Sequence, residues 1–240
     1  PLKQGKVDFV AHNVATTDFG DQVFPNYSMR EVNGVQVAVI GQAFPYTPIA
    51  HPRRFVADWS FGIQDDHLQQ VVDEVRKQGA QVVVLLSHNG MDVDLKLASR
   101  VTGLDAIMGG HTHDGVPQPM IVKNAGGQTL VTNAGSNGKY LGVLDFDVKG
   151  GKVAQWRYHL LPVFSNLLAP DPGMAALIDA SRLTRAPTCS DLGFALGPRI
   201  NAGGRVGEAT LGVRLLTTTD PDEAREIAAM LSQLNEERRA

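Results

Sequence analysis

The sequence predicts an α/β fold for residues 1–180 and a mostly helical segment for residues 181–240. Short, wholly apolar strand patterns alternate with amphipathic helical patterns in the first part, and polar loops follow those strands directly. After Asp171-Pro172 the composition changes, and Gly and Arg become frequent. Alternation of this kind is typical of a sheet with helices packed on its faces.

The bulk composition limits the classes of function. The chain has 240 residues, of which 43% are apolar, enough for one large domain or a medium domain with an appendage. A net charge of −3 does not favour general electrostatic binding to nucleic acid or acidic membranes. The single cysteine, Cys189, excludes an internal disulfide, and no apolar run is long enough to span a membrane. Since the chain begins at Pro1 without a signal-peptide pattern, we expect that it starts inside a larger protein.

The first elements follow from hydrophobic patterning. Residues 7–14 resemble a buried strand, and residues 27–40 resemble a hairpin that turns at Asn33-Gly34. A helix is predicted to begin at Asp65 and end at Gly79. Its apolar residues recur at helical spacing: Leu68, Val71, Val72 and Val75.

Three short apolar segments, 81–86, 104–109 and 129–133, are predicted to be buried strands, with a helix near 93–101 and a final hairpin turning at 149–151. Each buried strand runs directly into a polar loop. Open α/β sheets bind their ligands at the carboxyl ends of such strands.

Three histidines occupy these loops: His88, His111 and His113. Imidazole binds borderline metals such as Zn, Mn and Fe. In an extended His-X-His segment both rings point the same way, so His111 and His113 are expected to face one cavity. A lone histidine near a strand end is usually structural, but three at parallel strand ends favour a metal site. Asp114 either orients a ligating histidine or caps the loop.

The remaining histidines have no such setting. We interpret them as surface or packing residues: His12, His51, His67 and His159.

Three blocks, SHNG at 87–90, GGHTHD at 109–114 and NAGSNGKYLG at 133–142, resemble the later motifs of the metallophosphoesterase fold of the 5′-nucleotidase superfamily. Two more, GQAFPYTPIAHPRRFVADWSFG at 41–62 and LLPVFSNLLAPDP at 160–172, resemble the SoxB-type thiosulfohydrolases within it. The resemblance implies that residues 1 to about 180 form part of a layered sheet sandwich.

It further implies a divalent metal centre, with manganese in this branch and a pair of ions in the intact family. His88 and His111 resemble ligands of one ion, and His113 resembles a ligand of the other. The family reaction releases sulfate from a cysteine-bound thiosulfonate on a sulfur-carrier protein in the periplasm. Asn89, Asn137 and Lys139 are candidates for sulfonate contacts, with a structural role as the alternative for each, since Asn and Gly also serve tight turns.

The long segment 43–62 is rich in Pro and aromatic residues. Phe44, Tyr46 and Trp59 are candidates for a wall that receives the carrier's peptide, or they pack a lid.

The family's earlier motifs, Asp-X-His, Gly-Asp and Gly-Asn-His, are absent from this sequence, and His12-Asn13 does not replace them. Those motifs supply the bridging carboxylate. We therefore expect weak binding of one ion and little or no hydrolysis, and the sequence identifies no catalytic residue. A 5′-nucleotidase-like phosphoesterase is the alternative enzyme hypothesis.

Residues 183–240 resemble RecJ-type single-strand exonucleases of the DHH superfamily, which are cytoplasmic. In GPRINAGGR, Arg199 and Arg205 are candidates for phosphate contacts, or they are solvated arginines. The DHH motifs are absent, so this segment alone is not expected to be a nuclease. Single-stranded nucleic-acid binding is the third hypothesis. The joined segments suggest a chimeric or misassembled reading frame or an engineered fusion. A fourth hypothesis is a non-functional fusion whose open sheet face and strand edges favour aggregation.

Overall fold

The computed structural model describes residues 8–164, 170–185, 187–208 and 210–239, with the side chains of Cys189, Arg205, Val206 and Arg239 excepted. The chain forms two compact units that divide between Val163 and Phe164. In this division residues 170–180 belong to the helical unit, while the domain boundary near residue 180 stays a prediction. The cause of this assignment is helix α4, Pro172–Ala180, whose Leu177 is fully buried in the helical core.

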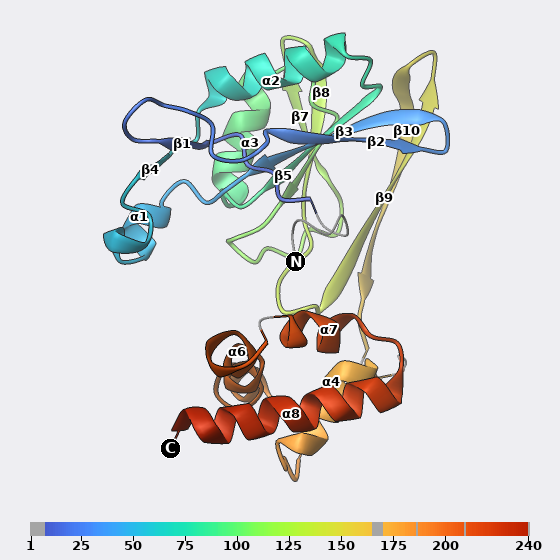
Figure 1. Cartoon of the computed structure of the whole chain (residues 1–240). Coiled ribbons are helices and arrows are strands. Elements are labelled where there is room, and N and C mark those ends of the chain that lie inside the picture. Colours follow the sequence, from blue (N-terminus) through green and yellow to red (C-terminus); the bar gives the residue numbers. More distant parts are fainter. Residues whose placement is uncertain (1–7, 165–169, 186, 209, 240) are drawn as a thin grey trace. The chain divides into compact units, whose positions relative to one another are not determined.

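The first unit contains a six-stranded sheet in the order β2-β3-β5-β6-β8-β7 (Figure 1). Strands β3, β5, β6 and β8 run parallel, while β2 and β7 pair antiparallel at the two edges. The bounds are β2 Tyr27–Val32, β3 Val35–Gln42, β5 Val82–Ser87, β6 Ala106–Gly109, β7 Met120–Asn124 and β8 Gly127–Asn133. This confirms the predicted α/β fold. The edge strand β7 was not predicted from the sequence.

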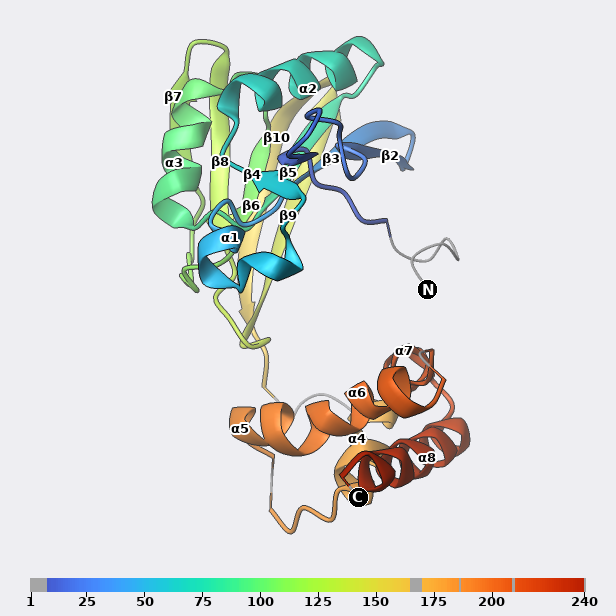
Figure 2. The same ribbon diagram turned by 60° about the vertical axis from the view of Figure 1, so that its left-hand side comes forward.

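Helices α2, Asp65–Lys77, and α3, Met91–Arg100, cover one face of this sheet (Figure 2). The predicted stripe of α2 is buried against strand residues such as Ile40 and Leu85. Each fully buried side chain of this size contributes roughly 1.5–3 kcal/mol. The hydrophobic pattern that predicted α2 is thus the same pattern that anchors it.

A long antiparallel ribbon, β9 Tyr140–Lys149 and β10 Lys152–Pro162, contributes to the opposite face. Phe146 and Val148 of β9, with Val84 and Met108 of the sheet, line a cleft of about 410 Å³. Leu86 on β5 remains 45% exposed. The sheet face expected to lie open is therefore only partly covered.

Two short strands form a separate two-stranded sheet. Strand β1, Val14–Thr16, pairs with β4, Trp59–Phe61. The segment between β3 and β4 contains α1, Thr47–Ala50, and a 3-10 turn, Arg53–Phe55. The strand expected over 7–14 is thus shorter and later than predicted, and its first residue lies outside the described part. His12 and Asn13 occupy a turn in which the Asn13 amide donates to Ala43 O and Gly62 O.

The second unit is helical, as predicted. Its elements are α4 Pro172–Ala180, α5 Cys189–Asp191, a π-helical turn Leu192–Leu196, α6 Gly197–Val206, α7 Leu211–Thr217 and α8 Pro221–Arg239. Ile227 and Leu231 of α8 are buried in its core, whereas Met230 is 49% exposed. No described helix is long and apolar enough to cross a membrane.

Candidate metal centre

Two of the three predicted histidines meet at the ends of neighbouring parallel strands. His88 follows β5, and His111 lies two residues after the end of β6. Because β5 and β6 are paired in parallel, their carboxyl ends lie side by side. The two imidazole centroids are 5.3 Å apart, with the rings inclined at 65°. The structure therefore brings both exposed rings together at one edge of the sheet. Their role as metal ligands stays a prediction.

The loop that carries His111 and His113 is turned, not extended. His111 has a φ of 77° and His113 a φ of 62°, both in the left-handed region. The amide of Thr112 donates to Gly110 O at 3.1 Å, which closes a tight turn centred on His111. The expectation of an extended His-X-His segment is therefore wrong, because this backbone turn changes direction at both histidines.

The electrostatic setting favours neutral imidazole at His88. Partial desolvation of the ring, and then the nearby His111 and His113, lower the pKa of His88 below its usual value. Neutral imidazole is the form that binds metal ions. His113 thus lies close enough to influence His88, although it adds no ring contact to the pair in the described structure.

The donor set suits one ion rather than two. In the part of the chain that the structure describes, no group of three or more His, Cys, Asp or Glu side chains could hold a metal ion. His88 and His111 offer two nitrogen donors, without a described carboxylate beside them to supply negative charge. A two-ion centre therefore does not fit these residues by themselves.

Aromatic side chains border the histidine pair. The Phe44 ring lies 4.2 Å from the His111 ring, centroid to centroid, and 6.0 Å from that of His88. Tyr46 packs edge-on against Phe44 at 5.7 Å and is 47% exposed. Trp59 packs instead against Phe24 at 5.4 Å. Phe44 and Tyr46 thus lie beside the histidine pair and Trp59 takes part in a different cluster, while a wall for a carrier peptide stays a prediction.

Asn89 and Asp114 bond to protein groups other than histidine. Asn89 is only 3% exposed, and its amide donates to Asp94 Oδ1 at 3.1 Å. It is therefore buried beneath the loops and does not face a substrate. The Asp114 carboxylate accepts from the Thr112 hydroxyl, and Asp114 O accepts from the Gly135 amide at 2.7 Å. Of the two interpretations of Asp114, the structure favours the loop cap.

Asn137 and Lys139 lie exposed in the loop after β8. Asn137 has a φ of 59°, the left-handed conformation that Asn tolerates in turns. The Lys139 amide donates to Ser136 O at 3.2 Å. Both residues therefore shape a turn, and a contact with a sulfonate or phosphate stays a prediction.

The other histidines occupy packing or surface positions, as predicted. His12 is fully buried and is hydrogen-bonded to Gln42, and its ring lies 5.4 Å from that of His67. Burial is the main cause that lowers the pKa of His12 to about 4. His51 and His159 are exposed.

Sequence reasoning missed one residue at this site, Asp94 on α3. It is fully buried, and burial raises the pKa of its carboxyl to about 6. Asp94 stands three and four residues before Leu97 and Ala98, which are buried on the same face of the helix. An acidic residue at an apolar position of a helical repeat was the signal that could have identified it.

In the helical unit, the Arg199 guanidinium serves packing. Nε donates to Ser232 Oγ at 3.0 Å and Nη1 donates to Ala195 O at 2.6 Å, which joins α6 to α8 and to the preceding turn. The side chain of Arg205 lies outside the described residues. A phosphate contact by either arginine stays a prediction.

Comparison with curated proteins gives two kinds of relative. Bovine 5′-nucleotidase is 29% identical over 179 residues, which cover 67% of this chain and 30% of that protein. The single-stranded-DNA-specific exonuclease RecJ of Dickeya dadantii is 48% identical over 69 residues, which cover 28% of this chain and 12% of that protein. The chain thus spans less than a third of either relative. No protein-family model matches the chain.

Solved structures agree with the first kind. The sulfate thiohydrolase SoxB of Thermus thermophilus is 37% identical with a TM-score of 0.64, over 70% of this chain and 30% of that chain. A 5′-nucleotidase precursor, also from Thermus thermophilus, is 30% identical with a TM-score of 0.56, over 68% of this chain and 35% of that chain. The first 180 or so residues are therefore covered by homologues among the metallophosphoesterases of the 5′-nucleotidase and SoxB kind, and a segment of about 69 residues is covered by RecJ homologues.

Proposed function

We propose that the sheet unit contributes one side of a metal-dependent hydrolase site of the SoxB type. The observation that carries this proposal is the meeting of His88 and His111 at the ends of adjacent parallel strands, with 5.3 Å between their ring centroids. These two residues would hold a divalent ion, for which manganese is the expectation from the resemblance. A metal ion lowers the pKa of bound water and polarises substrate oxygens.

The substrate of the whole enzyme is proposed to be a cysteine-bound thiosulfonate on a sulfur-carrier protein, in the periplasm. This choice is supported by the greater identity to SoxB, 37%, than to the 5′-nucleotidase precursor, 30%. The exposed Tyr46, packed on Phe44 beside the histidines, offers an aromatic surface for a peptide. A nucleotide is the alternative substrate, supported by the bovine relative.

By itself the chain is expected to bind one ion weakly and to show little or no turnover, because two imidazoles supply no negative charge to hold a pair of cations. Calorimetric titration of the full chain with Mn²⁺ tests this. Binding should be lost in His88→Ala and in His111→Ala, and should be kept in His159→Ala, a matched variant of an exposed histidine on β10. Binding that survives His111→Ala would contradict the proposed site.

The two substrate classes are separated by binding rather than turnover. With diamagnetic Zn²⁺ in place of Mn²⁺, a peptide carrying S-thiosulfonated cysteine should shift the NMR signals of Tyr46 and Phe44 more than AMP does at equal concentration. Tyr46→Ala should weaken only the binding of the peptide. A larger effect of AMP would favour the nucleotidase alternative.

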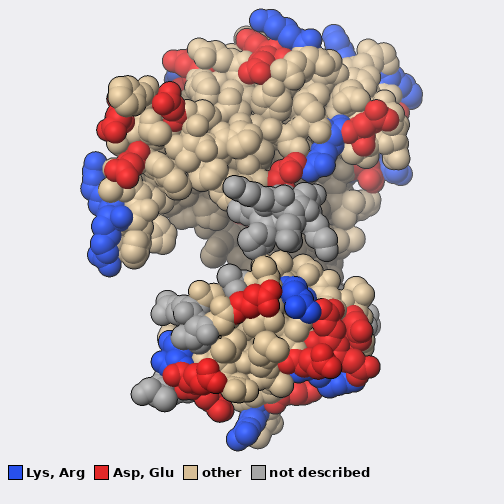
Figure 3. Space-filling view, viewed as in Figure 1, with Lys and Arg blue, Asp and Glu red and all other residues tan. Residues whose placement is uncertain are grey.

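Nucleic-acid binding by the helical unit is the second candidate, favoured by the 48% identity to RecJ. The hydrogen bonds of Arg199 within the unit and the acidic side chains on the face seen in Figure 3 oppose it. Salt-sensitive binding of single-stranded DNA that is lost in the Arg199→Ala, Arg205→Ala double variant would support it.

A further inference from the structure

A buried carboxylate lies at the carboxyl ends of the sheet strands, below the histidine loops. Asp94 on α3 is fully buried. Its Oδ1 accepts hydrogen bonds from the Ser87 hydroxyl at 2.6 Å and from the Asn89 amide at 3.1 Å. Within the described residues its Oδ2 has no partner. A buried carboxylate with an unpaired oxygen is costly, so stability alone does not explain this residue.

The unpaired oxygen faces the ends of two further strands. A Cβ placed on Gly109, the last residue of β6, would lie 2.7 Å from Asp94 Oδ2 and 3.8 Å from Asn133 Nδ2. Asn133 ends β8, pairs in register with Gly109, and is 1% exposed. Neither polar atom of its side chain has a partner in the described structure. The carboxylate thus reaches from α3 to the ends of β5, β6 and β8.

We propose that Asp94 is a positioning residue that fixes the spacing between the loops of His88 and His111; this inference rests on the proposed metal-binding role of those histidines. Ser87 and Asn89, which donate to Asp94, stand on either side of His88 in the sequence. Gly109 precedes His111 by two residues and leaves room for Asp94 Oδ2. A single carboxylate therefore restrains both loops.

The pKa of Asp94 is consistent with this role. Burial raises the pKa to about 6, although the hydrogen bonds from Ser87 and Asn89 lower it. Thr129 provides a contrast at the other end of the sheet. It is also fully buried, but its hydroxyl donates to Leu104 O at 2.9 Å and accepts from the Asn124 amide at 3.3 Å. The hydroxyl of Thr129 is thus fully hydrogen-bonded, whereas Asp94 Oδ2 has no partner within the described residues.

The test compares the full chain with Asp94→Ala, Asp94→Asn and Thr129→Val. The first measurement is the NMR shift of the His111 ring protons, which are sensitive to the Phe44 ring current because the two rings lie 4.2 Å apart. The second is the affinity for Zn²⁺ by calorimetry. The third is the midpoint of urea unfolding.

Asp94→Ala should move the His111 ring signals and weaken Zn²⁺ binding roughly 10- to 100-fold, the usual effect of losing a residue that orients ligands. In Asp94→Asn the side chain has nearly the same shape and still accepts from Ser87 and Asn89. This variant should therefore keep the wild-type His111 ring signals and the wild-type Zn²⁺ affinity. Thr129→Val should lower the unfolding midpoint and leave the ring signals and the Zn²⁺ affinity unchanged.

The proposal is overturned if Asp94→Ala lowers stability as Thr129→Val does, yet leaves the His111 signals and the Zn²⁺ affinity within about twofold of wild type. If the wild-type chain binds no Zn²⁺, the proposed function fails, and the ring signals alone still decide whether Asp94 positions the loops. Should Asp94→Ala not fold, Ser87→Ala, which removes the 2.6 Å hydrogen bond to the carboxylate, gives the same decision.

Discussion

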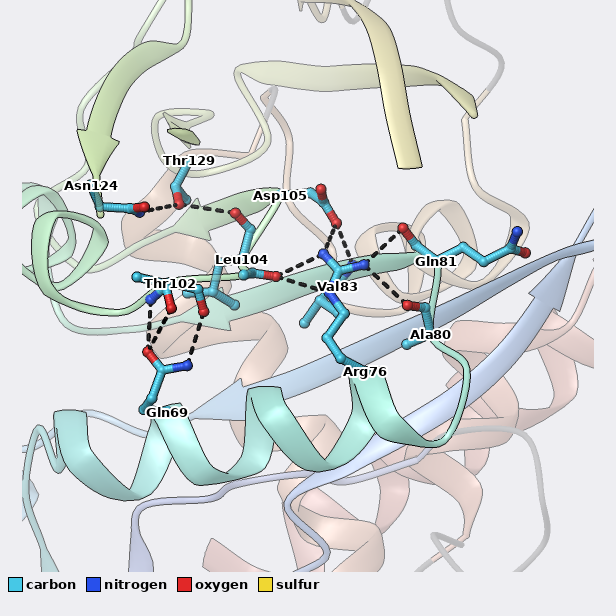
Figure 4. Close-up of polar contacts among 11 residues, drawn as sticks. Gln69, Arg76, Ala80, Gln81, Val83, Thr102, Leu104, Asp105, Asn124 and Thr129 are labelled. Atoms are coloured by element: carbon cyan, nitrogen blue, oxygen red, sulfur yellow. Dashed lines mark hydrogen bonds and ion pairs between the residues drawn. The ribbon is translucent and has the colours of Figure 1, made fainter. Parts of the chain in front are cut away.

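The two ends of the parallel strands differ in whether their buried polar groups are hydrogen-bonded. At the end where β5, β6 and β8 begin, Arg76 donates to the carbonyl oxygens of Ala80, Gln81 and Gly103, and to the Asp105 carboxylate (Figure 4). At the end where these strands finish, the side chains of Asn89, Asp94 and Asn133 hold four of the six buried polar side-chain atoms that have no partner in the described structure. The histidine pair lies only at this second end.

This contrast separates polar residues that stabilise the fold from polar residues that stability does not explain. Buried polar groups in proteins are nearly always hydrogen-bonded, and exceptions require an explanation. At the strand starts the network needs nothing more from a ligand or partner. At the strand ends the unpaired atoms lie beside two exposed imidazoles, which is the pattern expected where local stability is given up for function.

Asp105→Ala should produce the largest loss of stability. Asp105 Oδ2 accepts from the Val83 amide and from Arg76 Nη2, both at 2.7 Å. Removing it leaves a half-buried guanidinium without its charge partner, so the free energy of unfolding in urea should fall by about 3–4 kcal/mol. Binding of Mn²⁺ per folded molecule should stay as in wild type. A matching loss of metal affinity would break the comparison, because the two ends would then not be independent.

Asp94→Asn should raise the free energy of unfolding near neutral pH, whereas Asp105→Ala lowers it. The folded-state pKa of Asp94 is raised from 3.8 to about 6. The wild-type protein therefore becomes less stable as the pH rises from about 4 to 6, because the buried side chain must ionise. Asparagine removes this cost. Between pH 4 and pH 7 the variant should therefore gain about 2.4 kcal/mol of unfolding free energy relative to wild type.

The measurement is the difference in urea unfolding free energy between the two proteins at each pH. A difference is needed because His12, present in both proteins, changes the free energy of unfolding with pH in the direction opposite to Asp94. Its pKa is lowered to about 4, so its contribution to stability is present above about pH 6.5 and is lost as the pH falls through 4. A difference that does not change with pH would show that Asp94 is not a buried titrating carboxylate.

Much of this arrangement could be predicted from the sequence. The apolar runs placed β5, β6 and β8 to within about two residues, and the parallel order brought the loops of His88 and His111 to one edge of the sheet. The hairpin at Asn33-Gly34 and the helix from Asp65 also agree with the structure. These features depend on local periodicity, which sequence contains directly.

Other features depend on tertiary contacts and could not be predicted in the same way. The left-handed backbone at His111 and His113 results from a turn in the loop, while the pattern GGHTHD is equally compatible with an extended segment. The assignment of α4 to the helical unit depends on packing of Leu177 against residues far along the chain. Asp94 was detectable in principle, because it interrupts an apolar helical face.

Gly109→Ala tests how tightly the strand ends are packed. The added Cβ would lie 2.7 Å from Asp94 Oδ2 and 3.1 Å from Thr132 O, so the cluster must shift, at a cost of about 2 kcal/mol. The matched variant is Gly115→Ala, whose Cβ would only touch Tyr140 at 3.6 Å. Thermal unfolding and the NMR signals of His88 and His111 report the result. Equal behaviour of the two variants would mean that the buried cluster does not confine the loops.

Gln69→Ala should have the smallest effect. The Gln69 side chain accepts from the Thr102 amide at 2.8 Å and donates to Thr102 O at 3.1 Å, which joins α2 to the loop between α3 and β6 (Figure 4). Losing this pair of bonds between α2 and the loop that joins α3 to β6 should lower the free energy of unfolding by about 1 kcal/mol and should speed hydrogen exchange at the Thr102 amide. Gln70→Ala, on an exposed position of the same helix, controls for helix propensity. If the two variants cost the same, the strand-start network does not stabilise the fold through its individual hydrogen bonds, and the difference between the two ends of the sheet loses its energetic basis.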